Sequence, residues 1–301
     1  MIVTVTANPA LDVTYRVGAL EPGAVIRPAE VRKRAGGKGF NVARVLHALG
    51  REVLALGPVG GADATLIRED LAAAGIPHRL TGIAGVTRRT TALVAPDAVT
   101  LVNEPGPRLS EVEWGQVAGE VARQLEHADV LVCSGSLPPG APSDGYAHLI
   151  GLARKAGVPV VLDTSGEALR EGIRAGPDVV KPNADELREL TDDPHELRAR
   201  GAGAVLVSLG ADGMLAATPD GTWLARPSRK LGGNTTGAGD AAVAGIALNP
   251  RQDWPAVLRQ AVALSAAAVL GPLAGDVDLD HYRRELGAVT VEETHATGVN
   301  G

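Results

Sequence analysis

The segment from Gly232 to Asp240 holds the residue types best suited to chemistry in this chain. It reads Gly-Gly-Asn-Thr-Thr-Gly-Ala-Gly-Asp and continues into a run of small residues from Ala241 to Leu248, which predicts a helix. Glycines allow backbone N–H groups to turn towards a ligand, and the start of a helix favours negative charge. A carboxylate in such an anion-favouring position suits phosphoryl transfer.

In that interpretation Asp240 takes the proton of an attacking hydroxyl. The N–H groups of Gly237, Ala238 and Gly239 then hold the charge that develops on the transferred phosphoryl group. The alternative is an ordinary capped helix, in which Thr236 or the threonine before it is the N-cap and the aspartate complements the helix dipole. The segment alone leaves both interpretations open.

A second glycine-rich segment, Gly36-Gly-Lys-Gly-Phe-Asn41, also opens a predicted helix. Its glycines, Gly37 among them, permit a close ligand approach, and Lys38 and Asn41 lie on the same side of the first turn. It is not a Walker A loop, because Arg32 occupies the position of the leading glycine. The alternative is that these glycines only make the start of a helix more flexible and bind no ligand.

Basic residues surround this segment in an otherwise acidic chain: Arg27, Arg32, Lys33, Arg34 and Lys38. Arg88 lies in a later segment, at about residues 78–103, that like residues 13–35 has the pattern of short strands. A solvated strand face explains most such charge runs. The functional alternative is a positive field that attracts a phosphorylated substrate, with Arg88 suited to bidentate phosphate recognition.

Three further segments carry polar residues next to predicted strands. Asp12 follows the first strand, where a carboxylate can accept hydrogen bonds from vicinal sugar hydroxyls. In Lys181-Pro-Asn-Ala-Asp-Glu186, Asn183 and Glu186 have the spacing of a capping box, or lie near magnesium and its waters while Lys181 lies near nucleotide phosphate. The turn from Ser208 through Gly210 to Gly213 either binds a nucleotide or has no binding role.

Composition narrows the class of protein. The chain has 301 residues, 45% of them hydrophobic, a net charge of −6 and one cysteine, Cys133. The charge argues against nucleic acid or an anionic membrane as partner. A single cysteine permits no intramolecular disulfide and fits a reducing cytoplasm, and no apolar run reaches membrane-spanning length.

Short, nearly continuous apolar runs recur between helical patterns and predict parallel strands covered on both faces. They lie at residues 2–6, 53–56, 130–133, 158–162, 179–180 and 205–208. We therefore expect one domain over residues 1–301, an α/β protein with a mostly parallel central sheet in a three-layer α/β/α sandwich. The tail from Thr290 to Gly301 lacks apolar periodicity, and we expect it to be loosely held.

Two stretches interrupt this rhythm, at about residues 13–35 and 78–103. Both have the pattern of short antiparallel strands and are predicted to pair into one small sheet. Such a sheet is a candidate lid over the carboxyl ends of the main strands, where ligands bind in open α/β sheets. A pair of ordinary surface hairpins is the alternative.

Taken together, these segments resemble the ribokinase-like sugar kinases, specifically the PfkB group. Seven motifs occur in the order of that family and span nearly the whole chain, at residues 6–12, 36–41, 103–107, 134–139, 181–186, 208–213 and 235–240. The resemblance implies a ribokinase-like fold and makes Asp240 the catalytic base, with the backbone of residues 237–239 as the anion hole. It places the sugar-side aspartate at Asp12 and the pair that organises magnesium at Asn183 and Glu186.

Within the group, the chain looks most like 1-phosphofructokinases and tagatose-6-phosphate kinases. That resemblance implies that Lys38, Asn41, Arg88 and Ser136 contact a phosphosugar. ATP and Mg²⁺ are then the expected cofactors, with nucleotide contacts from the residues Lys181, Ser208, Gly210, Gly213 and Thr236. It also implies a homodimer formed through the lid.

The expected activity is transfer of the γ-phosphoryl of ATP to a ketohexose phosphate, with fructose 1-phosphate as the first choice of acceptor. Tagatose-6-phosphate kinase is the close alternative. A non-catalytic sugar or nucleotide sensor on the same fold is the alternative from another class. An intact Asp240 argues against the sensor, because a sensor needs no base.

Overall fold

The computed structural model describes residues 1–21, 23–96, 98–251 and 253–294. Its main sheet has ten strands: β1 (Ile2–Thr6), β4 (Val53–Val59), β5 (His78–Gly82), β8 (Val130–Ser134), β9 (Val160–Asp163), β10 (Val179–Val180), β11 (Ala204–Ser208), β12 (Met214–Thr218), β13 (Gly221–Arg226) and β14 (Thr290–Glu293). They lie in the order β14-β13-β12-β11-β10-β9-β8-β1-β4-β5. The strands from β11 to β5 pair in parallel, and β12, β13 and β14 extend one edge in antiparallel fashion.

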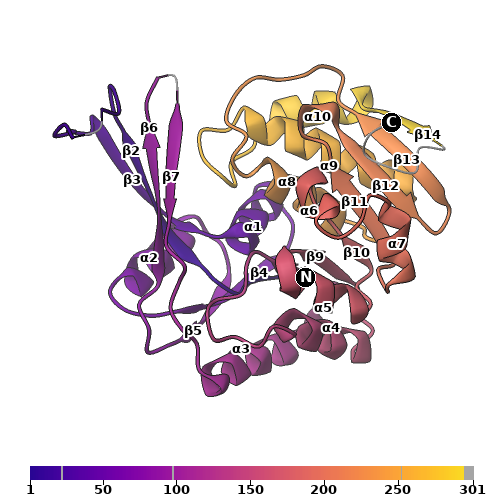
Figure 1. The fold of residues 1–301 in the computed structure, drawn as a ribbon, viewed down its shortest axis with the longest axis horizontal. Helices are drawn as coiled ribbons and strands as arrows, with labels where there is room; N and C mark the ends of the chain where they lie inside the picture. The colour runs from indigo at the N-terminus through magenta and orange to yellow at the C-terminus, as the bar shows by residue number, and fades with distance from the viewer. Residues whose placement is uncertain (22, 97, 252, 295–301) are drawn as a thin grey trace.

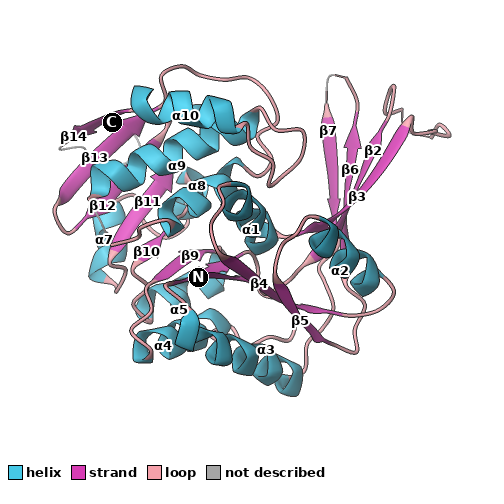
Figure 2. Ribbon diagram, turned by 180° about the vertical axis from the view of Figure 1, so that it is seen from behind, coloured by secondary structure: helices cyan, strands magenta, loops and turns pink. Residues whose placement is uncertain are grey.

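Helices cover both faces of this sheet (Figures 1 and 2). One layer contains α1 (Lys38–Ala48), α2 (Asp63–Ala73), α8 (Ala238–Ala247), α9 (Trp254–Val269) and α10 (Leu279–Ala288). The other contains α3 (Glu111–Gln124), α4 (Gly145–Lys155), α5 (Gly166–Arg174), α6 (Ala184–Arg188) and α7 (Pro194–Ala199). Single 3₁₀ turns form η1 (Leu125–His127) and η2 (Gly210–Asp212).

The side chains of the apolar runs pack into two hydrophobic cores, one under each helical layer. In β8, Val130 and Val132 pack into the first core, while Leu131 and Cys133 pack into the second. Successive side chains of a strand point to opposite faces, so a strand buried on both faces must be apolar throughout. The expected three-layer α/β/α architecture is confirmed.

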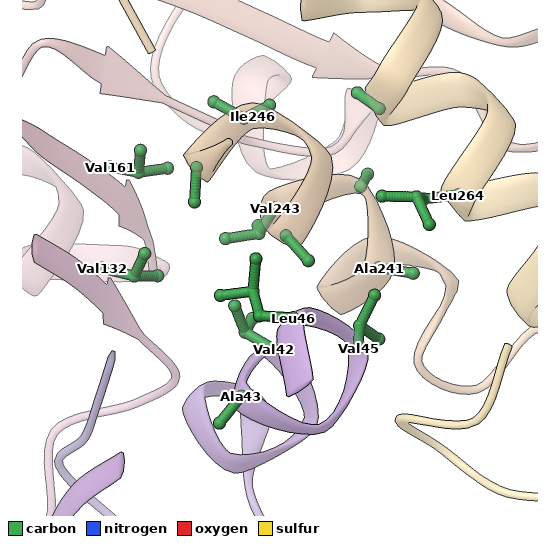
Figure 3. Close-up of a cluster of buried hydrophobic side chains, with 14 of the residues drawn as sticks. Val42, Ala43, Val45, Leu46, Val132, Val161, Ala241, Val243, Ile246 and Leu264 are labelled. Atoms are coloured by element: carbon green, nitrogen blue, oxygen red, sulfur yellow. The ribbon is translucent and has the colours of Figure 1, made fainter. Parts of the chain in front are cut away.

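Small residues bring the helices of the first layer close together beneath the candidate site. Figure 3 shows Val42 and Leu46 of α1 facing Val243 of α8. A Cβ added at Gly245 would lie 2.7 Å from the backbone of Ala261, so α8 and α9 approach more closely than larger side chains would allow. The starts of α1 and α8 are thereby held side by side.

A separate four-stranded sheet, the lid, stands beside the main body (Figures 1 and 2). Its strands are β2 (Ala10–Arg16), β3 (Glu30–Gly36), β6 (Arg88–Val94) and β7 (Val99–Asn103), in the order β3-β2-β6-β7. The expected pairing of the two unusual segments is therefore found, but its centre, β2 with β6, is parallel rather than antiparallel.

Two expectations about chain segments need correction. Residues 78–82 form β5, which pairs in parallel with β4 at the edge of the main sheet and so lies outside the lid. Their mixed pattern fits an edge strand with one covered face as well as it fits a lid strand. The start of the tail is held, because Thr290–Glu293 pairs with β13; residues 295–301 lie outside the described ranges.

Candidate active site

The carboxyl ends of neighbouring parallel strands align a row of polar side chains. Thr6 of β1 pairs in register with Ser134 of β8, and Ser134 pairs with Asp163 of β9. Lys181 directly follows β10, and its N–H donates to the carbonyl of Leu162. This edge is where open α/β sheets bind ligands.

Asp163 is the buried centre of a cluster of charges. Its two carboxylate oxygens lie 3.2 Å from the ammonium groups of Lys38 and Lys181, and Ser134 donates a hydrogen bond of 3.2 Å. Burial alone would raise the pKa of the Asp163 carboxyl, but the two lysines outweigh it and the pKa lies below its usual range. Burial likewise opposes the charge on Lys38, yet neighbouring carboxylates, Asp163 first among them, raise its pKa.

Asp240 lies in the first turn of α8 and is 7% exposed. The side-chain amide of Asn41 donates a hydrogen bond of 2.8 Å to its carboxylate. Burial and the negative charge of Asp163 raise the pKa of Asp240 to about 7, against the opposing effects of Asn41 and the two lysines. A carboxyl group with a pKa near neutrality can both take up and release a proton, which is what a general base requires.

The start of α8 has the backbone geometry of an anion site. Gly237 is the N-cap, and its φ of 85° is a left-handed conformation that glycine adopts readily. The N–H of Ala238 donates to the carbonyl of Thr235 over 3.2 Å. Among the described residues at this helix start, the N–H groups of Gly237, Gly239 and Asp240 donate no backbone hydrogen bond and so remain for a ligand. A role for Ala238 stays a prediction that requires its turn hydrogen bond to open.

Asp12 projects from β2 and is enclosed by glycine backbone. A Cβ added at Gly36 would lie 2.1 Å from the carboxyl carbon of Asp12, and one added at Gly37 would lie 2.5 Å from a methyl group of Thr6. A side chain at position 36 would therefore displace the Asp12 carboxylate, whereas at position 37 the φ of 111° makes glycine the favoured residue whatever the space. Burial raises the pKa of Asp12 to about 6, although Arg88 and a hydrogen bond from Thr90 act against it.

Arg88 and Ser136 meet at a third residue, Asn8. The Arg88 guanidinium donates to the carbonyl of Asn8 over 3.2 Å and to the carbonyl of Glu104 over 3.1 Å. The Asn8 amide group donates to the Ser136 hydroxyl over 3.3 Å. Since Arg88 also lies close enough to Asp12 to act on its pKa, these residues form one side of the site beside the lid.

Two cavities flank the loop before α8. The larger, about 670 Å³, lies between the lid and this loop; Asp12, Arg34 and Thr90 line it on the lid side. The smaller, about 280 Å³, is lined by three residues of the predicted nucleotide set, Ser208, Gly210 and Gly213, and by Asn183 of the predicted magnesium pair. Thr235 lines both cavities, so the start of α8 separates the larger space from the smaller one.

The residues predicted to bind nucleotide and magnesium are arranged differently from expectation. Thr236 lines the larger cavity, because its N–H bonds to the side chain of Asn234 and Gly237 then turns the chain. Asn183 and Glu186 form a complete capping box at α6, each side chain accepting from the backbone N–H of the other over 2.7–2.8 Å. A Cβ added at Gly239 would lie 3.8 Å from the Lys181 ammonium, so this lysine lies against the start of α8.

Sequence reasoning missed two residues of the site. Asp163 ends the apolar run of β9, and an acid that follows a predicted parallel strand is a signal that could have been used. Asn8 follows β1 and looks like an ordinary turn residue before Pro9. Its contact with both Arg88 and Ser136 is visible only in three dimensions.

Comparison with known proteins agrees with this geometry. Residues 5–280 match the model of the pfkB family carbohydrate kinases. The chain is 40% identical over 262 residues to a 1-phosphofructokinase of Xanthomonas campestris pv. campestris, an alignment that covers 81% of this chain and 82% of that one.

Solved structures agree as well. Phosphofructokinase-2 of Escherichia coli in complex with fructose-6-phosphate superposes with a TM-score of 0.86 at 29% identity, covering 95% of this chain and 98% of that one. A possible 1-phosphofructokinase of Thermotoga maritima superposes with a TM-score of 0.86 at 26% identity, covering 98% and 99%. With a family match over most of its length and a buried carboxylate at the head of a helix between two cavities, this chain belongs to the pfkB family of carbohydrate kinases and is a phosphotransferase.

Proposed function

We propose that this kinase transfers the γ-phosphoryl group of ATP to the 6-hydroxyl of fructose 1-phosphate, giving fructose 1,6-bisphosphate and ADP. The observation that carries the chemistry is Asp240, buried at the start of α8 with a pKa of about 7. The choice of sugar is supported by the 40% identity to a 1-phosphofructokinase.

In the proposed reaction the acceptor hydroxyl lies within reach of Asp240 and loses its proton to this carboxylate. The oxygen attacks the γ-phosphorus, and the bond between that phosphorus and the bridging oxygen of ADP breaks. The N–H groups of Gly237 and Gly239 and the ammonium of Lys181 neutralise the charge on the phosphoryl oxygens. The proton leaves Asp240 afterwards, which its pKa near 7 makes easy.

Recognition of the sugar phosphate falls to the side of the site beside the lid. Asp12 is suited to accept hydrogen bonds from sugar hydroxyls, and Asn41 holds Asp240 in place. Arg88, Ser136 and Lys38 are the candidates for the phosphate group already on the sugar. Arg88 already donates to two carbonyls, which fixes its guanidinium in the wall of the site.

The donor set also fits a magnesium ion carried with the nucleotide. Among the described residues no cluster of three or more His, Cys, Asp and Glu side chains is preformed for a metal. Mg²⁺ keeps several waters and binds through nucleotide phosphates with one or two carboxylates, so it does not need such a cluster. Glu186 would hold it, through water, with the Oε1 atom that the capping box leaves free, and Asn183 with the second lone pair of its one side-chain oxygen; when bound, it neutralises phosphate charge.

The lid also suggests a partner, a second copy of this chain. Its strands expose large apolar side chains in number: Val31, Val99, Leu101 and Val102 are each about half exposed or more. Exposed apolar surface of this kind is typical of an interface. We propose a homodimer formed through the lid, which light scattering on the purified protein would test.

The proposed compartment is the cytoplasm, where ATP is available. None of the helices in the described ranges combines the length and the apolar character that crossing a membrane requires. Fractionation of cells that express the natural chain, followed by immunoblotting, would test this assignment.

The test of the substrate is a coupled ADP-release assay with fructose 1-phosphate, fructose 6-phosphate, tagatose 6-phosphate and unphosphorylated sugars, each with and without Mg²⁺. The product is identified by phosphorus NMR. The proposal predicts the highest kcat/KM for fructose 1-phosphate and no turnover without a divalent cation. A higher kcat/KM for tagatose 6-phosphate would replace the proposed substrate. Calorimetric binding of sugar phosphate without any ADP release would favour the sensor.

A further inference from the structure

One ion pair joins the lid directly to the loop beside the catalytic helix. Arg34 of β3 donates from Nη2 to the Asp276 carboxylate over 2.6 Å, although 242 positions separate the two residues. The side chains are 18% and 30% exposed, so water screens this pair less than it screens a surface pair. The Nη1 atom of Arg34 is buried and, among the described residues, has no hydrogen-bond partner.

At its lid end the pair touches the sugar side of the site. Arg34 lies directly opposite Asp12 in the β2–β3 register, and Thr90 lies opposite Asp12 on the other side. These three side chains form one row that lines the larger cavity. The charge of Arg34 also acts on the pKa of Asp12. A shift of Arg34 therefore changes the surroundings of the carboxylate that is proposed to bind the sugar.

At its other end the pair touches the catalytic machinery. Asp276 ends a short loop after α9 whose Ala274 packs on Gly237, where an added Cβ would come within 2.8 Å of the Ala274 backbone. The next residue, Gly275, backs onto α1, and its added Cβ would lie 3.3 Å from Cα of Asn41. The loop thus contacts both the N-cap of α8 and the residue that donates to Asp240.

The lid has a second tie to the main body that lacks these contacts. Arg89, on the opposite face of β6, forms two hydrogen bonds of 2.6 and 2.9 Å with Asp63 at the start of α2. Asp63 does not line either of the two cavities described above. Arg89 and Asp63 therefore provide a matched comparison: an ion pair between lid and body that is remote from the anion hole.

Charge explains why the first pair is sensitive to its surroundings. Arg44 of α1 lies near Arg34, and burial together with this like charge lowers the pKa of Arg44. Asp276 is the carboxylate that offsets the repulsion on the Arg34 side, while Arg44 itself pairs with Asp70. Without Asp276, the repulsion between Arg34 and Arg44 would lose this offset.

We propose that Arg34 and Asp276 are positioning residues that couple occupancy of the sugar site to the arrangement of the anion hole. This inference rests on the proposed kinase function. Sugar that binds against Asp12 fixes the base of β3, and the ion pair then fixes the loop that supports Gly237 and Asn41. By linkage, a nucleotide bound at the start of α8 must strengthen sugar binding by the factor by which bound sugar strengthens nucleotide binding.

The test is an equilibrium measurement of this coupling. Calorimetry gives the Kd of fructose 1-phosphate with and without a saturating non-hydrolysable ATP analogue and Mg²⁺, for the wild type, Arg34→Gln, Asp276→Asn and the double variant. We expect the analogue to tighten sugar binding at least threefold in the wild type and by less than 1.5-fold in all three variants. The double variant should be no worse than either single variant, because one interaction is lost in each.

Three controls keep the outcome decisive. Arg89→Gln should keep the wild-type coupling even if its melting temperature falls, and Arg34→Lys should recover part of it. Steady-state assays should give a lower kcat/KM for the sugar phosphate in the Arg34 and Asp276 variants, and the Kd of the ATP analogue measured at saturating sugar phosphate should rise by the factor by which the coupling falls, because linkage is reciprocal. If the wild type shows no coupling, or if Arg34→Gln retains it, the inference is overturned.

Failure of the proposed function is a different result, namely no turnover with any sugar phosphate by the wild type. The coupling ratio is then measured with whichever sugar binds.

Discussion

Asn41 of α1 donates a hydrogen bond of 2.8 Å to Asp240 of α8, and both side chains are buried. The bond favours the ionised form of Asp240, whereas burial and the charge of Asp163 favour the protonated form. The pKa of about 7 is the balance of these effects. The hydrogen bond and the charge of Asp163 can each be removed by a single substitution, and the two substitutions should shift the pKa of Asp240 in opposite directions.

Asp240→Asn removes the base but keeps the size of the side chain. We expect kcat to fall by about 10²- to 10⁴-fold, because general base catalysis contributes on that order. The Kd for ATP should stay within a fewfold, since the backbone donors of α8 are unchanged. Single-turnover kinetics and nucleotide binding measure the two quantities; sugar phosphorylation at a near wild-type rate would show that Asp240 is not the base.

The same variant should be more stable than the wild type at neutral pH. Folding raises the pKa of Asp240 from 3.8 to about 7, so the folded state holds a proton that the unfolded state loses in this interval. The contribution of this group to stability is therefore complete below pH 3.8, declines as the pH rises to 7 and is constant above it. Denaturant unfolding should show an advantage for Asp240→Asn that grows between pH 4 and pH 7; an advantage independent of pH would contradict the raised pKa.

Asn41→Ala removes the hydrogen bond that favours ionised Asp240. The pKa of Asp240 should rise, and the acid limb of the profile of kcat/KM against pH should move to higher pH. At pH 7 we expect kcat/KM to fall at least about tenfold, because a hydrogen bond to a charged group is worth about 1.5–3 kcal/mol. Part of this loss should be recovered at pH 9. A profile that is lowered evenly at every pH would instead assign Asn41 to sugar binding alone.

Asp163→Asn should move the same limb in the opposite direction. The charge of Asp163 raises the pKa of Asp240, and its loss also frees Lys38 and Lys181, whose charges lower that pKa. The variant should also lose about 3–5 kcal/mol of unfolding free energy, because Lys181, 4% exposed, is left without its buried partner. The control is Asp185→Asn, an 85% exposed residue whose loss should cost no more than about 0.5 kcal/mol. An acid limb shifted to higher pH would contradict the cluster's proposed role.

Gly36→Ala tests the contact between the glycine segment and Asp12. The added Cβ would meet the Asp12 carboxylate, which is the mobile end of a side chain, so the backbone can stay and the carboxylate must turn aside. We expect the KM for the sugar phosphate to rise about tenfold or more while the KM for ATP is unchanged, since a lost hydrogen bond to a charged group is of this size. Gly115→Ala in α3, where nothing lies within 4 Å of the added Cβ, should stabilise the protein by about 0.5–1 kcal/mol and leave both KM values unchanged.

The sequence predicted the fold where burial on both faces forces a pattern. The runs at β8 and β9 are apolar at every position before their last residue, and β1 interrupts its apolar residues only with the β-branched Thr4 and Thr6, so all three were recognisable as parallel strands. Edge strands were not, because β5 and β14 are only partly buried and their pairing depends on which partner the chain folds beside. For the same reason β5 was assigned to the wrong sheet.

The site was predictable where the glycines and the acid are adjacent in sequence, as at residues 237–240. It was not predictable where distant residues converge on one side chain. Asp163 is a single acid at the end of a strand. The sequence around it gives no signal that Lys38, 125 positions earlier, contacts it. Of the predicted nucleotide set, Ser208, Gly210 and Gly213 line the smaller cavity. Lys181 does not line it, and Thr236 lines the larger cavity, because its orientation depends on the turn at Asn234.

Glu285 offers a last test, because it anchors a wall of the smaller cavity without touching it. Both of its carboxylate oxygens accept hydrogen bonds of 2.6 Å from Ser228, one from the backbone N–H and one from the hydroxyl. The neighbours Pro227 and Arg229 line that cavity. Glu285 is 3% exposed whereas Ser228 is exposed to solvent, so Glu285→Ala removes both hydrogen bonds but lets the donors bond to water, and we expect a cost of about 0.5–1.5 kcal/mol in stability.

If the smaller cavity holds the nucleotide, the KM for ATP should rise severalfold in Glu285→Ala while the KM for the sugar phosphate stays within about twofold, because the anchored loop is remote from the lid. Glu285→Gln, which keeps one acceptor, should lie between the two. A change confined to the sugar phosphate would contradict the assignment of the smaller cavity to the nucleotide, and equal effects on both KM values would indicate a general loss of folding rather than a displaced wall.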